Sequence, residues 1–266
     1  MKKIIFTLLA VICFASMGYS QVTTLWEKSV TAGTKPVWET GSLTRGISYG
    51  LVGGNQLFFV VSRSALIGGK QIIYYNALTG DSLGQLDNTG IVGGVAIVND
   101  VEVSTDGKIF VSNMTTNASA DAFKVYRYDS LLAAPVAVIS YNAAVMRLGD
   151  KVTVTGSTTD NSIVIWAANA AATGEIVKFT TTDNGLTFTA SIVNIGALVS
   201  FASASVGPLP GSDFYFNAHG MNAQKFTSAG TLVGTISNTA LGTAGSAIRF
   251  FKSIAGDEYV VANALG

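Results

Sequence analysis

The chain of 266 residues is poor in the side chains that most often carry chemistry, with one cysteine, Cys13, and one histidine, His219. These numbers exclude a multi-histidine or multi-thiolate metal site, and any Ser-His-Asp triad would have to include His219. Because His219 lies in Asn217-Ala218-His219-Gly220, shortly after the apolar run 214–216, we interpret it as a polar loop residue. No Gly-x-Ser-x-Gly, phosphate-loop or His-Glu-x-x-His motif occurs. We therefore predict neither a metal nor a cofactor, and we assign no catalytic residue.

Charged residues are scarce as well, at 12% of the chain against 48% hydrophobic residues. Acidic and basic residues are equal in number, 16 of each, and no long run of either sign occurs. The chain thus lacks the basic surface that binds nucleic acid. Its apolar content is enough for a large core.

The amino terminus has the pattern of a bacterial secretion signal. Two lysines precede fourteen uncharged residues, 4–17, and Gly18-Tyr19-Ser20 places small residues where signal peptidase reads. The apolar stretch is shorter than the about 20 residues that cross a membrane. We expect residues 1–20 to be a Sec-type signal peptide cleaved before Gln21. The mature protein would then be secreted or at the cell surface, and not inserted in the membrane.

The sequence predicts no long helix, because it shows no long apolar stripe with a period of 3.6 residues. Short runs rich in Val, Ile, Phe and Tyr alternate instead with Gly, Asn, Asp, Ser and Thr, which favours strands and tight turns. Five units share this texture, and the strongly apolar runs within them start 52, 54, 51 and 45 residues apart. These runs are residues 57–61, 109–111, 163–166, 214–216 and 259–261.

The repeat length predicts an all-β fold, a β-propeller with four antiparallel strands in each blade. Because blades stack face to face, their middle strands are covered on both sides, which explains apolar runs that do not alternate with polar residues. A β-sandwich is the alternative, although its strands would alternate more regularly. The approximate blades are 44–90, 91–143, 144–195, 196–240 and 241–266, the last of them incomplete.

The two ends of the repeat region raise the question of how the ring is completed. Within the amino-terminal segment, 21–43, residues 25–30 and 36–40 could form strands that close the ring on the last blade. The fifth unit holds sequence for its first two strands only. An open ring would expose an apolar face and an unpaired strand edge. We therefore expect the chain to be a piece of a longer protein rather than a closed five-blade ring.

A turn in the third unit resembles the Asp-box of sialidase-like propellers. Residues 181–188 read Thr-Thr-Asp-Asn-Gly-Leu-Thr-Phe, with threonine in place of the usual first serine and Phe188 in place of tryptophan. The resemblance implies a structural hairpin between the third and fourth strands, in which Asp183 binds turn amides and Phe188 packs into the blade. Gly185 and Thr187 belong to the same turn.

Segments of the first three units also resemble a family of secreted bacterial propellers that has no characterised function. The resemblance implies the propeller fold and secretion, and it brings no reaction and no catalytic residues. The segments that carry it are Thr44-Arg45-Gly46-Ile47-Ser48-Tyr49, residues 57–63, Asn76-Ala77-Leu78-Thr79-Gly80, and residues 89–94, 106–116 and 123–127.

Three of the five arginines have a regular spacing. Arg45, Arg147 and Arg249 lie at or just before the first strand of alternate units, and 102 residues separate each from the next. The first strands of a propeller line its central channel, so these cations could bind a common anion. The alternative is that they are solvated or structural.

The function that we predict is that of a binding or structural interaction module for an extracellular glycan or protein. A sialidase-like or other extracellular glycosidase is the alternative, because such an enzyme needs arginines and acidic residues rather than histidine. It would also need a close pair of carboxyl groups at the channel. Acidic side chains near Arg45 and Arg147 would therefore distinguish the two functions.

The secreted protein should begin at Gln21, with the new amino-terminal glutamine cyclised, because the signal peptidase site precedes it. Intact mass spectrometry of the secreted fraction measures this directly. A mass that still includes residues 1–20 would contradict the prediction.

Overall fold

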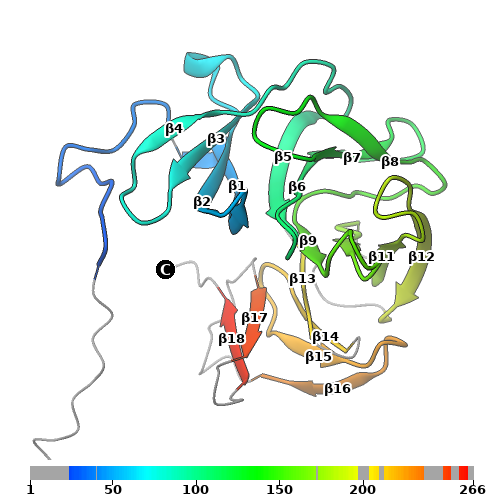
Figure 1. The fold of residues 1–266 in the computed structure, drawn as a ribbon. Helices are drawn as coiled ribbons and strands as arrows, with labels where there is room; N and C mark the ends of the chain where they lie inside the picture. Colours follow the sequence, from blue (N-terminus) through cyan, green and yellow to red (C-terminus); the bar gives the residue numbers. More distant parts are fainter. Residues whose placement is uncertain are drawn as a thin grey trace, which may run out of the picture.

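Figure 1 shows the chain as a ring of β-sheets in a computed structural model. The structure describes residues 24–39, 41–171, 173–196, 204–209, 213–236, 248–252 and 258–262. The predicted signal peptide lies outside these residues. Within the described ranges, no helix is long and apolar enough to span a membrane.

Four sheets have four antiparallel strands each, in chain order from the centre of the ring outward (Figure 1). Blade 1 contains β1 (Thr44–Val52), β2 (Asn55–Ser62), β3 (Gln71–Asn76) and β4 (Ser82–Gln85). Blade 2 contains β5 (Ala96–Val103), β6 (Ile109–Met114), β7 (Phe123–Tyr128) and β8 (Val136–Tyr141). Blade 3 contains β9 (Val152–Thr155), β10 (Val164–Ala168), β11 (Glu175–Thr180) and β12 (Thr189–Asn194). Blade 4 contains β13 (Ser205–Pro208), β14 (Phe214–Asn217), β15 (Gln224–Phe226) and β16 (Leu232–Thr235).

A fifth sheet pairs β17 (Ile248–Lys252) with β18 (Glu258–Ala262). The only other regular elements in the described ranges are two short 3-10 helices, η1 (Gly41–Leu43) and η2 (Ala65–Ile67). The propeller prediction is confirmed, and the β-sandwich is excluded. Each predicted apolar run overlaps the second strand of one sheet, namely β2, β6, β10, β14 and β18.

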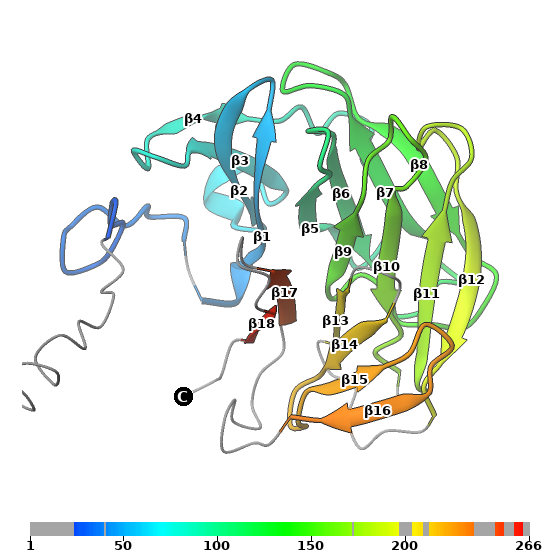
Figure 2. The same ribbon diagram turned by 60° about the horizontal axis from the view of Figure 1, so that its bottom comes forward.

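The middle strands are apolar because both of their faces are buried. All six residues of β6 are buried. Its Ile109 and Val111 share an apolar cluster with Phe59 of blade 1. Phe110, which lies between them in the strand, shares another cluster with Val154 of blade 3. Successive side chains of one strand therefore pack against two different neighbouring blades. Figure 2 shows these neighbouring sheets side by side.

The amino-terminal segment does not form the ring-closing strand that its sequence suggested. Residues 24–39 contain turns and no strand. In Figures 1 and 2 this segment runs along the side of blade 1 that faces away from blade 2. Trp38 packs there against Val60, Ile73 and Tyr75, so the aromatic side chains of the segment cover a sheet face instead of pairing with a strand edge.

Asp106 and Gly107 lie in the hairpin that joins β5 to β6. Gly107 has a φ of 82°, which glycine adopts at little cost. A Cβ at this position would also lie 2.5 Å from the backbone carbonyl oxygen of Leu51 in blade 1. Glycine thus allows the turns of adjacent blades to approach each other.

Val111→Asp should unfold the domain, because Val111 is fully buried between two blades. An unpaired buried charge costs on the order of several kcal/mol, against a total stability of about 5 to 15 kcal/mol. Thermal unfolding followed by circular dichroism measures the effect. Leu132→Asp is the control, because Leu132 is 94% exposed and should tolerate the charge. A Val111→Asp variant that melts as the wild type does would contradict the assigned core.

Candidate functional site

The inner strands place a cluster of charged side chains at the centre of the ring. β5 contributes two carboxyl groups, Asp100 and Glu102, which are only 2% and 7% exposed. Asp100 accepts hydrogen bonds from the backbone N–H groups of Val101, at 3.1 Å, and of Val152 on β9, at 2.7 Å. Asp100 therefore joins the inner strands of blades 2 and 3.

Glu102 connects β5 to two further parts of the ring. Ser48 on β1 donates a hydrogen bond to its Oε2 atom at 3.4 Å. Arg249 on β17 forms an ion pair with its Oε1 atom and donates a second hydrogen bond to Thr153 on β9, at 3.1 Å. Arg249 thus links the fifth sheet to blades 2 and 3.

Burial dominates the acid–base properties of this cluster. It raises the pKa of the Glu102 carboxyl to about 8, although the Arg249 guanidinium favours the charged form. Burial also raises the pKa of Asp100, against the opposing charges of Lys151 and Arg249. Glu102 therefore takes up a proton at a higher pH than an exposed glutamate does, and protonation would neutralise its ion pair with Arg249.

The structure gives each of the three predicted arginines an acceptor of its own. Arg249 binds Glu102, as described above. Arg147 lies before β9 and binds Asp150 through two hydrogen bonds of 2.7 and 2.5 Å, which raises the pKa of the arginine. Arg45 on β1 donates to Asn99 of β5 at 3.3 Å. The three guanidinium groups therefore contribute to contacts within and between blades.

Sequence reasoning missed the carboxyl groups, although a signal was present. Asp100 and Glu102 are two acidic residues in an otherwise largely apolar first strand. The neighbouring Gly46 on β1 is a second signal, because a Cβ there would collide with the Asp100 carboxylate.

His219 was interpreted correctly, since it lies exposed in the turn after β14. In the described parts of the chain, no three His, Cys, Asp or Glu side chains are grouped as metal ligands.

The turn between β11 and β12 contains the four residues predicted as a structural hairpin. Asp183 accepts hydrogen bonds from the backbone N–H groups of Leu186 and Thr187, at 3.1 and 2.9 Å, and from the Thr187 hydroxyl at 2.6 Å. These bonds hold the pKa of Asp183 well below its usual range. Gly185 has a φ of 75°, and Phe188 packs edge-on against Phe110 with ring centroids 6.5 Å apart.

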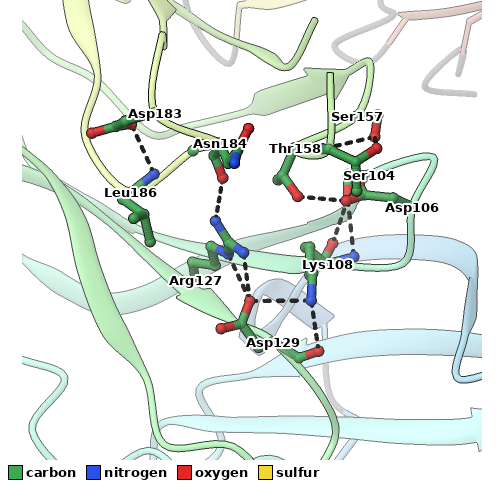
Figure 3. Close-up of polar contacts among 12 residues, drawn as sticks. Ser104, Asp106, Lys108, Arg127, Asp129, Ser157, Thr158, Asp183, Asn184 and Leu186 are labelled. Atoms are coloured by element: carbon green, nitrogen blue, oxygen red, sulfur yellow. Dashed lines mark hydrogen bonds and ion pairs between the residues drawn. The ribbon is translucent and has the colours of Figure 1, made fainter. Parts of the chain in front are cut away.

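Figure 3 shows how this turn is tied to blade 2. Arg127 on β7 donates to the carbonyl oxygen of Asn184 at 2.6 Å and forms an ion pair with Asp129. Asp106 accepts a 2.5 Å hydrogen bond from Thr158 of blade 3. The polar side chains drawn here thus stabilise the contact between two blades.

A different kind of site lies between the amino-terminal segment and blade 1. Two hollows, of about 210 and 240 Å³, share Trp38 as a lining residue. The first is lined mainly by aromatic and aliphatic side chains, with a few polar groups, and its aromatic residues are Trp26, Trp38, Phe58 and Tyr75. We call the two hollows together the aromatic groove.

Local interactions hold Trp26 in this groove. Its Nε1 atom donates to the carbonyl oxygen of Ala77 at 2.8 Å, and its ring packs edge-on against Phe58. Gly80 makes room for the ring, because a Cβ there would lie 2.6 Å from the indole. Ala77 and Gly80 lie in the turn that follows β3. Asn76 shapes this turn, because its Oδ1 atom accepts hydrogen bonds from the backbone N–H groups of Leu78 and Thr79.

Residues 54–206 match the family described as a domain of unknown function, DUF8500. The chain belongs to this family. No curated protein matches its sequence.

Solved structures with the same architecture are remote in sequence. A DUF4623 family protein from Bacteroides eggerthii has a TM-score of 0.65 at 17% identity, covering 83% of this DUF8500 chain and 50% of its own. The chain thus spans half of the length of that protein. An endo-arabinase from Bacteroides thetaiotaomicron has a TM-score of 0.51 at 11% identity, covering 84% of this chain and 90% of its own. These likenesses show the fold alone.

Raising the pH should destabilise the wild type relative to Glu102→Gln. The unfolded state releases the Glu102 proton above its ordinary pKa, whereas the folded state retains it up to about pH 8. The free energy of unfolding contributed by this group is therefore largest below the ordinary pKa and is lost as pH rises towards 8. Thermal unfolding between pH 5 and 9 measures the difference.

Glu27→Gln is the control for the loss of one negative charge, because Glu27 is exposed. The thermal unfolding midpoint of Glu27→Gln should follow that of the wild type from pH 5 to 9. A difference between the wild type and Glu102→Gln that stays constant with pH would show that Glu102 is ionised throughout.

Proposed function

We propose that this DUF8500 protein is an extracellular binding module whose ligand occupies the aromatic groove. The observation that carries the proposal is the groove itself, which is open, mostly apolar and lined by side chains held in place by their neighbours. Ligand sites in proteins typically combine such a lining with a few polar groups. The extracellular location rests on the secretion signal predicted for residues 1–20.

The charged groups at the ring centre are less suited to bind a ligand than the groove is, because they already have partners. Its carboxyl and guanidinium groups bind one another and the backbone of adjacent blades, as Asp100 does with Val152 and Arg147 does with Asp150. A side chain with such partners must lose them before it can bind a ligand, at a cost of about 1 to 3 kcal/mol for each buried group left unpaired. The groove requires no such loss.

A glycosidase is the second candidate, and one observation favours it. Burial raises the pKa of Glu102 to about 8 beside a second buried carboxyl group, Asp100, and a proton donor of raised pKa is what glycoside hydrolysis needs. The fold similarity to an endo-arabinase does not add to this argument. In this second case Glu102 would be the general acid.

The binding proposal predicts that a double variant, Trp26→Ala with Trp38→Ala, loses the ligand. The secreted protein is applied to an array of glycans and peptides, and each hit is titrated by calorimetry. We expect the double variant to bind at least about tenfold more weakly, which corresponds to 1.4 kcal/mol. Tyr215→Ala is the matched control, because Tyr215 is a half-buried aromatic residue of blade 4 and should bind normally.

The same preparations distinguish the two candidates when aryl glycosides are added. Turnover that Glu102→Gln abolishes would replace the binding proposal with the glycosidase. A hit that the double variant binds as tightly as the wild type would also contradict the groove as the ligand site.

A further inference from the structure

We infer that the aromatic groove binds a linear, uncharged oligosaccharide, with one sugar ring in each hollow and Trp38 between the two rings. This inference rests on the proposed binding function and names its ligand class. It follows from the sizes of the hollows, the distribution of polar groups around them, and the backbone pairing of blade 1.

The sizes of the hollows suit small rings joined in a chain. Each hollow, at about 210 or 240 Å³, is below the range of about 300 to 1,000 Å³ that is typical of sites for drug-sized ligands. Trp38 is the one residue that lines both. A ligand made of two similar units on either side of one aromatic ring matches this arrangement.

The first hollow is amphipathic in the way that a sugar ring is. Trp26, Phe58 and Tyr75 provide aromatic surface, on which the C–H face of a sugar can stack. Lys28, Glu39 and Thr44 provide hydrogen-bonding groups among the same lining residues. The buried Thr44 hydroxyl has no hydrogen-bond partner in the part of the chain that the structure describes.

Tyr75 adds a donor to this hollow. Burial, and after it the Glu39 carboxylate, raises the pKa of the Tyr75 hydroxyl, so the phenol keeps its proton. The second hollow repeats the pattern with fewer aromatic residues. Ile67 and Ile73 are its apolar groups, and Ser82 and Gln85 are its polar side chains.

Charge favours an uncharged ligand. Lys28 and Glu39 are the charged residues that line the first hollow, one of each sign, and the second hollow is lined by none. An anionic or cationic ligand would therefore meet one favourable and one unfavourable charge. Hydroxyl groups can use both, because they donate to a carboxylate and accept from an ammonium group.

Backbone pairing disfavours an extended peptide on the groove floor. A peptide strand binds by adding its N–H and C=O groups to an open sheet edge. The floor residues Phe58, Ile73 and Tyr75 belong to β2 and β3, whose residues pair with strands on both sides. The floor of the first hollow thus presents side chains rather than free backbone groups, whereas the second hollow is lined in part by the edge strand β4.

The groove is also partly organised before a ligand binds. The Ala77 carbonyl oxygen and the space left by Gly80 fix the Trp26 ring. Rigid aromatic surface lowers the entropy lost on binding. Sugars, which offer few strong contacts for each ring, benefit most from such a surface.

The test is a chain-length series. The secreted protein is titrated with xylose, glucose, arabinose and mannose and with their linear oligomers of two to four units. Calorimetry gives the affinity, and tryptophan fluorescence reports the location. The only tryptophan outside the groove, Trp166, is buried between blades 3 and 4, so a change in emission reports Trp26 or Trp38.

We expect one series to bind, with the dimer at least about tenfold tighter than the monomer and little gain beyond two units. Trp38→Ala should weaken dimer binding at least about tenfold, whereas Trp38→Phe should restore most of it. Tyr215→Ala should bind as the wild type does. Unchanged thermal unfolding of each variant shows that the fold is intact.

Three results would overturn the inference. These are a monomer that binds as tightly as its dimer, a Trp38→Ala variant with unchanged affinity, or no binding by any saccharide of the series. If a peptide from the array binds and the double variant loses it, the binding function stands and the saccharide inference alone fails. If neither class binds, both fail.

Discussion

The requirement that both faces of each sheet be covered determines most of this structure. A strand such as β6 sends Ile109 and Val111 towards blade 1 and Phe110 towards blade 3, so it has no polar face to offer to water. Burial of apolar surface contributes about 25 cal/mol for each Å². Stacking in a ring satisfies this requirement for every blade that has a neighbour on each side. Blade 1 packs against blade 2 on one face only, and residues of the amino-terminal segment cover part of its other face.

Stacking also brings the inner strands so close together that polar groups among them are buried. Buried carboxyl groups destabilise a fold unless hydrogen bonds replace the lost water. Asp100 receives two backbone N–H groups and Glu102 receives Ser48 and Arg249, so the ring centre joins blades 1, 2 and 3 and the fifth sheet. The glycine at position 46, which leaves space for the Asp100 carboxylate, belongs to the same arrangement.

The repeat was predictable because it depends on local pattern: an apolar run about every fifty residues, with turn residues between. The turn at Asp183 was predictable for the same reason, since its hydrogen bonds join residues within one short segment. The ring centre was not predictable, because Arg249 and Glu102 are 147 residues apart and no local pattern pairs them. The course of residues 24–39 was missed for a related reason. Their apolar residues have the composition of a strand, and only the three-dimensional structure reveals the uncovered sheet face on which Trp26 and Trp38 pack.

That face explains why a groove forms at this place. A sheet packed on a sheet interdigitates along its whole length, whereas an irregular segment touches a sheet only where its larger side chains reach it. Trp26 and Trp38 make such contacts, and the spaces beside them are the two hollows. β1 extends the same apolar face with Ile47, Tyr49 and Leu51, which are half exposed. An incompletely covered apolar face with fixed aromatic rings is a surface that gains free energy when a ligand completes it, and polar groups at its edges then decide which ligand fits.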